Sequence, residues 1–209
     1  MNLSSDLAWA KRTGGRLSRM HAATYIWQVL ILQARSRRPA PRMAIEFADE
    51  MIELPDSSIV TAALAECRDT CPEAIASHCL RTFAWGCLIA AGRNLKVDRE
   101  TFAVASLLHD IEIGRTGERL ATGCLCFACA GAVRAEAFVI THGRDADWAR
   151  RVGDAISLHL DPIVLPSQGV EAHVLQAGAA LPVLHERSVP ADAHDDRLAV
   201  VLAERRTWA

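Results

Sequence analysis

The segment ASLLHDIEIG, residues 105–114, ends an apolar run with two adjacent side chains that can bind a metal ion, His109 and Asp110. Neighbouring residues on a helix point about 100° apart, so the pair cannot belong to one apolar stripe. At the last turn of a helix, however, both side chains can reach a point just beyond its end. An imidazole nitrogen with a carboxylate oxygen suits manganese, iron, zinc or nickel better than calcium, which prefers oxygen ligands alone. The pair is a candidate metal site, and an ordinary solvated helix end is the alternative.

Two further histidines lie in segments with helical spacing. His78 occurs in AIASHCLRTFAWG, where the residues four positions away, Ala74 and Thr82, are small and leave room for the imidazole. His159 ends the apolar pattern of GDAISLHLDP. Either could be a core or rim histidine. Three helices that each offer one histidine are also how helical bundles build metal sites in their cores.

The elements that must position these residues are predicted to be helices. Helix-start residues such as Ser57 and Asp98 precede apolar positions three and four residues apart, and Gly92 and Gly143 close two of the patterns. The predicted helices cover residues 20–34, 55–71, 72–92, 97–110, 126–143, 145–160 and 170–181. Alternating runs long enough for a sheet are absent from the sequence. We therefore expect an all-α, single-domain helical bundle with an additional N-terminal helix.

Composition narrows the class of protein. The 209 residues are 51% hydrophobic but only 5% aromatic, which favours a helical protein, and the net charge of -2 is not that of a nucleic-acid-binding protein. The seven cysteines form an odd number and follow no secretory signal, so we expect a cytoplasmic protein that uses thiols as small apolar side chains. A metal site at Cys124, Cys126 and Cys129 is the alternative. The longest apolar stretch is too short for a transmembrane segment.

The N-terminal region is basic. Residues 7–45 contain no acidic residue and eight basic ones, Lys11, Arg12, Arg16, Arg19, Arg35, Arg37, Arg38 and Arg42. We expect the helix in this region to cover the core of its own domain. Contact with an anionic membrane surface, or with a partner such as a second copy in a homodimer, is the alternative. The expected parts are a basic helical extension over 1–54, a helical domain over 55–187, and a C-terminal tail or helix packed on it over 188–209.

Four segments in order resemble the HD superfamily of metal-dependent hydrolases, and most of all its cyanamide hydratase-like branch. They are SHCLRTFAWG, ASLLHD, CFACAGAVRAEAF and VGDAISLHLDP, and the resemblance covers residues 55–187. It implies an all-α HD-type bundle in which His78, His109 and Asp110 bind the metal and His159 lies beside the metal or the substrate. It also implies a small-molecule substrate, either a phosphate ester that is hydrolysed or a nitrile-like compound that is hydrated.

The sequence departs from the HD pattern at one expected ligand. The family supplies a further aspartate from a later helix, and alignment on the small residues of LQAGAALPVLHER places Pro182 there. Proline offers no ligand atom. Asp154, Asp161 or His185 could replace the missing carboxylate, or fewer protein ligands could bind the metal. A degenerate, non-catalytic binding protein with the same fold is the remaining alternative.

Two charged residues follow the His–Asp pair. Arg115 is predicted to bind an anionic substrate, because a guanidinium binds phosphate or carboxylate through two parallel hydrogen bonds. Glu112 could accept a proton from an activated water molecule. An exposed arginine and a solvated loop carboxylate are the alternatives for these two positions.

Overall fold

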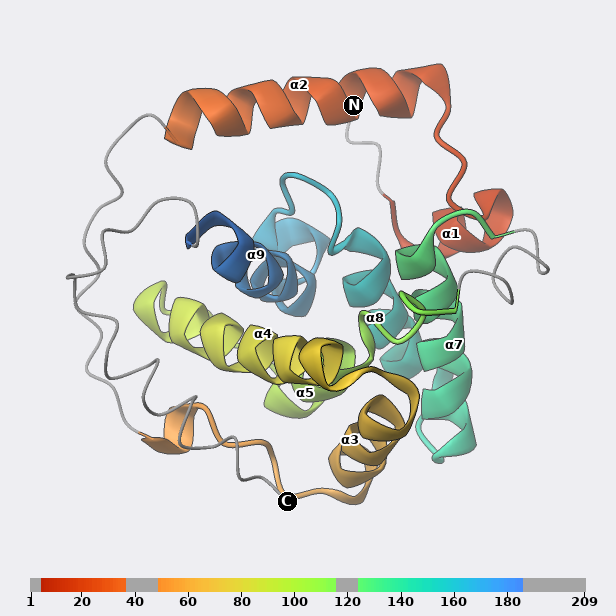
Figure 1. Ribbon diagram of the computed structural model, residues 1–209, viewed down its shortest axis with the longest axis vertical. Coiled ribbons are helices and arrows are strands. Elements are labelled where there is room, and N and C mark those ends of the chain that lie inside the picture. The colour runs from red at the N-terminus through yellow and green to blue at the C-terminus, as the bar shows by residue number, and fades with distance from the viewer. Residues whose placement is uncertain (1–4, 37–48, 116–123, 186–209) are drawn as a thin grey trace.

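The computed structural model describes residues 5–36, 49–115 and 124–185, and the side chains of residues 35, 36, 49 and 181–185 lie outside that description. This part of the chain is all-α and contains no strand, as the sequence predicts (Figure 1). Its α-helices are α1 (Leu7–Thr13), α2 (Arg19–Ser36), α3 (Ser58–Thr70), α4 (Glu73–Gly92), α5 (Arg99–Leu108), α7 (Phe127–Thr141), α8 (Ala146–Leu158) and α9 (Val170–His185). Short 3-10 helices lie at Asp49–Met51 and Pro166–Gln168.

The predicted helix starts are confirmed by their caps. The side chains of Ser57, Asp98 and Asp145 accept hydrogen bonds from the backbone N–H groups three residues later, at the starts of α3, α5 and α8. Each bond satisfies a donor that the first turn of a helix leaves without a partner. Asp6 caps α1 in the same way, although the sequence analysis did not predict that short helix.

The core surrounds α5, whose residues 101–108 are all buried. Two glycines allow α4 to approach its neighbours closely: Gly178 lies at the contact of α9 with α4, and Gly86 at the contact of α4 with α5. A Cβ atom added at Gly178 would lie 2.6 Å from the carbonyl oxygen of Thr82, and one added at Gly86 would lie 2.1 Å from the ring of Phe102. These contacts hold α4, α5 and α9 at fixed separations, and α4 and α5 are two of the helices that carry the candidate metal ligands.

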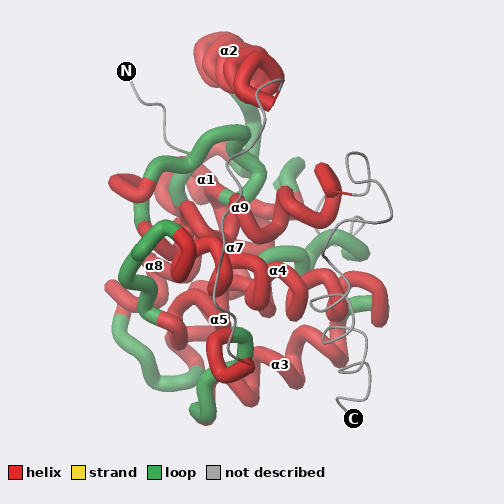
Figure 2. The backbone as a smooth tube through the Cα atoms, turned by 90° about the vertical axis from the view of Figure 1, so that its left-hand side faces the viewer, coloured by secondary structure: helices red, strands yellow, loops and turns green. Residues whose placement is uncertain are grey.

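The N-terminal helix α2 lies across one end of the bundle and apart from the other helices (Figure 2). One face touches the rest of the protein: the His21 ring lies 5.5 Å from that of Trp9, and the Tyr25 hydroxyl donates to the carbonyl oxygen of Leu160 at 3.2 Å. The other face leaves large apolar side chains such as Ile26 and Trp27 exposed. None of the described α2 side chains is fully buried or belongs to the main core cluster, so the expectation that this helix covers the core is not confirmed.

One helix of the described residues, α4, is long and apolar enough to cross a membrane by length and hydropathy alone. Of that stretch, 56% is buried inside the bundle, and its inward side chains include Cys79 and Phe83. We therefore describe α4 as a core helix of the bundle.

Candidate metal centre

Three helices bring their histidines together at one buried place. His78 lies in the second turn of α4, whereas His109 and His159 follow the last residues of α5 and α8 as their C-caps. Asp110 is the residue after the α5 cap, so both members of the His–Asp pair lie just beyond a helix end, as the sequence predicts. His109 is fully buried, and Asp110 and His159 are nearly so.

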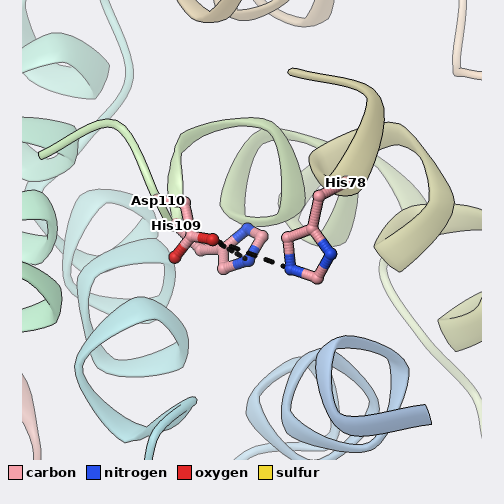
Figure 3. A group of neighbouring side chains, drawn as sticks. All are labelled: His78, His109 and Asp110. Carbon is pink, nitrogen blue, oxygen red and sulfur yellow. Dashed lines mark ion pairs between the residues drawn. The ribbon is translucent and has the colours of Figure 1, made fainter. Parts of the chain in front are cut away.

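The side chains of His78, His109 and Asp110 point toward one another (Figure 3). The Nε2 atoms of the two histidines lie 3.6 Å and 3.3 Å from Oδ2 of Asp110, and the ligand atoms of all three residues lie within 4.8 Å of one another. One ion between them could therefore contact two imidazoles and a carboxylate. This is the one group of three or more such ligands among the residues that the structure describes.

His159 contacts the other oxygen of the same carboxylate. Its Nε2 atom lies 3.6 Å from Oδ1 of Asp110, and its ring meets that of His109 edge-on with centroids 4.9 Å apart. The family resemblance implies a position beside the metal or the substrate for this histidine. In the structure His159 lies next to the His–His–Asp group, on the side of the Asp110 carboxylate that carries Oδ1. Asp110 is thus surrounded by three imidazoles.

Backbone hydrogen bonds fix the orientation of two of these rings. Nδ1 of His109 lies 2.8 Å from the carbonyl oxygen of Ser106, and Nδ1 of His159 lies 2.6 Å from that of Ile156. A carbonyl only accepts, so Nδ1 carries the hydrogen and Nε2 of a neutral ring presents its lone pair. A histidine that binds a metal through one ring nitrogen usually donates a hydrogen bond from the other, because that bond holds the ring in place.

The fit of a cation is supported by an unsatisfied atom. Nε2 of His109 is one of five buried side-chain atoms without a partner of hydrogen-bond geometry among the described residues, and the only one of the five on a side chain that commonly binds metals. Leaving a buried polar atom unpaired costs about 1–3 kcal/mol, and native proteins do so rarely and often at functional sites. Two imidazole nitrogens and a carboxylate oxygen are also a donor set that transition metals accept. The residues present therefore fit a divalent ion.

The charges of the group reinforce this fit. Burial, together with the neighbouring His109, lowers the pKa of both His78 and His159 to about 4, so these rings are neutral at pH values near neutrality. Burial opposes ionisation of Asp110, but the adjacent His109 outweighs it and lowers the pKa of the carboxyl to about 2. Burial likewise opposes protonation of His109, and the Asp110 carboxylate overcomes it and raises the pKa of this ring. The Asp110 carboxylate is therefore ionised beside two neutral imidazoles, and it favours a positive charge next to it.

Charged residues beside the group form an ion-pair cluster. Arg134 of α7 donates from one nitrogen to Glu112 at 2.8 Å and from another to Glu66 of α3 at 2.7 Å. Arg115 lies 3.5 Å from the same Glu112 oxygen. Arg134 and Glu66 were not predicted as functional residues, because pairing across three segments leaves no local pattern in the sequence. Glu112 is buried in these pairs and is not the solvated carboxylate of one alternative, while substrate binding by Arg115 stays a prediction.

The residues considered as replacements for the missing aspartate lie elsewhere or outside the described side chains. Asp154 accepts from the backbone N–H of Leu7 at 2.9 Å and from Arg150 at 2.8 Å, and Asp161 lines a hollow beneath α2 together with Tyr25. Position 182 lies within α9, but its side chain and that of His185 are outside the description. Neither described aspartate belongs to the His–His–Asp group.

The cysteines are free and do not form a group of metal ligands among the described residues. Five are buried, and Cys124 and Cys126 are half-buried. Cys129 packs with Trp9 and Ala10 in a small apolar cluster. This arrangement agrees with the expectation that the thiols serve as small apolar side chains and gives the alternative of a cysteine metal site no support.

Fold and site together define an all-α bundle with a buried His–His–Asp group where three helices meet. Scans against models of known protein families and against curated protein sequences give no match. The resemblance to the HD superfamily therefore stays a prediction from the sequence.

Proposed function

We propose that the protein is a metal-dependent hydrolase of the HD type that acts on a small molecule. His78, His109 and Asp110 hold a divalent transition metal in this proposal, and iron, manganese, zinc and nickel all suit the donors. The observation that carries it is the fully buried Nε2 atom of His109, which lacks a hydrogen-bond partner and lies 3.3 Å from the Asp110 carboxylate. A bound cation would satisfy that atom and neutralise that charge.

In this proposal the ion activates water and substrate, and the protein residues hold and orient the ion. When bound, a divalent ion lowers the pKa of a water molecule and polarises the atom under attack. Asp110 supplies the negative charge that holds the ion, and the Ser106 carbonyl keeps the His109 ring in the metal-binding tautomer. His159 contacts Oδ1 of Asp110, so it orients the carboxylate.

A phosphate ester is the substrate class that the neighbouring charges favour. Arg115 is about one-third exposed and follows the His–Asp pair by five residues, so its guanidinium can meet an anion at the edge of the site. A nitrile-like substrate, as in the cyanamide hydratase-like branch, needs no such cation. The two chemistries are distinguished by the substrates that the protein turns over.

The proposal is tested by turnover of the purified protein loaded separately with each of the four metals. Nucleotide and sugar phosphates are assayed beside small nitriles, with His109→Ala and Asp110→Ala as site variants and His142→Ala as the control. His142 is exposed and caps α7 with an ordinary bond to the Phe138 carbonyl. We expect the site variants to lose about a hundredfold or more in rate and the control to lose none.

Two outcomes contradict the proposed hydrolase. Turnover that persists in metal-stripped protein, or in His109→Ala, rules out the assigned centre. Tight metal binding to the parent without turnover of either substrate class favours the non-catalytic binding protein that Pro182 suggests.

A further inference from the structure

The outward face of α2 is an apolar surface that the protein itself leaves uncovered. The exposed fractions are 65% for Trp27, 60% for Ile26, 53% for Met20 and 52% for Leu30. Single exposed apolar residues are common on proteins, but a contiguous group usually marks a binding surface. These four residues fall within three turns of one helix.

Helical geometry places this group on the side away from the bundle. His21, Thr24, Tyr25 and Gln28 line the hollow between α2 and the rest of the protein, so they define the inward face. Ile26 and Leu30 lie on the opposite side, four residues apart, and Trp27 and Met20 lie together along one edge of this face. Figure 2 shows α2 end-on above the other helices, with its outer side free of any described element.

The charge of this region is opposite to that of the remaining chain. Residues 7–45 contain eight of the 23 basic residues and none of the 25 acidic ones, so the rest of the chain is strongly acidic. Arg16 and Arg19 are exposed at the start of α2, and Arg19 lies on the same side of the helix as Ile26 and Leu30. A binding partner for this face must therefore accept apolar side chains and carry negative charge beside them.

We propose that the outward face of α2 binds an anionic phospholipid surface, with the helix lying in the plane of the interface. Apolar and aromatic side chains enter the boundary between headgroups and acyl chains, and arginines contact lipid phosphates and carboxylates. A second copy fits less well, since pairing two outward faces brings two basic segments together without acidic partners. This proposal is independent of the metal centre.

The test measures co-sedimentation of the full chain with vesicles of phosphatidylcholine, with and without phosphatidylserine. We expect binding to the vesicles that contain phosphatidylserine and a strong decrease in binding as salt is added. The double variant Ile26→Ser, Leu30→Ser removes apolar side chains that point to water, so the fold is retained and binding falls by about tenfold or more. Arg16→Glu with Arg19→Glu leaves the apolar group intact and weakens binding to the anionic vesicles alone.

The matched control is Ile140→Ser with Leu165→Ser, two apolar residues that are each 47% exposed on other elements. This control is expected to bind as the parent does. The proposal is overturned if the parent does not bind the anionic vesicles, binds both kinds equally, or is unaffected by both α2 variants. It is also overturned if sedimentation equilibrium shows a dimeric parent that both α2 variants convert to a monomer, since the face is then a protein interface. Circular dichroism and Tm confirm that each variant is folded.

Discussion

Nε2 of His109 lies 3.3 Å from Oδ2 of Asp110, although the two residues are consecutive in the chain and consecutive helical side chains diverge. The convergence is possible because α5 ends at Leu108, so His109 is its cap and Asp110 already lies in the following turn. The end of the helix thus turns two neighbouring residues into a pair that faces His78 and His159. It also explains why the apolar run of α5 stops where it does.

Asp154 is expected to be a structural residue and not a metal ligand. Its carboxylate accepts from the Leu7 N–H at the start of α1 and from Arg150, so Asp154→Ala should lower the free energy of unfolding by about 1–2 kcal/mol. Asp147→Ala removes another, exposed partner of the same Arg150 and should have little effect. Urea unfolding measures both, and a loss of bound metal in Asp154→Ala would contradict the structural role.

Gly178 is expected to be needed for the contact between α9 and α4. An added Cβ would lie 2.6 Å from the carbonyl oxygen of Thr82, a backbone atom that cannot move aside without shifting α4. Overpacking of this kind costs about 1–3 kcal/mol, and the better helix propensity of alanine offsets at most about 1 kcal/mol of it. Gly178→Ala should therefore lower Tm, whereas Gly114→Ala, which meets no atom within 4 Å, should leave it nearly unchanged.

Asp161 should make stability depend on pH. Burial raises the pKa of this carboxyl to about 6, and hydrogen bonds from Ser5 offset only part of the shift. Folding then favours the protonated form, so the contribution to stability is complete below about pH 4 and is lost as the pH rises through about 6. Asp161→Asn cannot ionise and should be more stable than the parent by about 1–2 kcal/mol near pH 8, after allowance for partial exposure.

The check is urea unfolding of the parent and Asp161→Asn near pH 8 and near pH 4. The difference in unfolding free energy between the two proteins should shrink or vanish at the lower pH. The exposed Asp56→Asn is the control and should show no such change. An equal difference at both pH values would mean that ionisation of Asp161 is not its cause.

Local patterns were sufficient for most of the helices and for the His–Asp pair. Ser57 and Asp98 are predicted helix starts and are caps in the structure, because a cap acts within one turn. His159 was expected at a helix end and lies there for the same reason. Its contact with Asp110 follows from the packing of α8 against α5, so the sequence could suggest that contact only through the family resemblance.

The remaining features depend on long-range packing. Apolar residues occur on all sides of α2, so its sequence did not distinguish the inward face from the outward one. Arg134, Glu112 and Glu66 come from three segments that are distant in the chain, and only the fold makes them a cluster. The two helix contacts at Gly86 and Gly178 likewise required the positions of α4, α5 and α9.

The most direct test of the central claim is elemental analysis of the untagged protein beside His78→Ala, His109→Ala and the control His142→Ala. We predict about one equivalent of iron, manganese, zinc or nickel in the parent and in the control, and none in the two site variants. Thermal unfolding should show that added metal raises the Tm of the parent and control alone. Parent protein that stays free of metal after incubation with all four ions, or site variants that retain it, would contradict the assignment of His78, His109 and Asp110 as a metal centre.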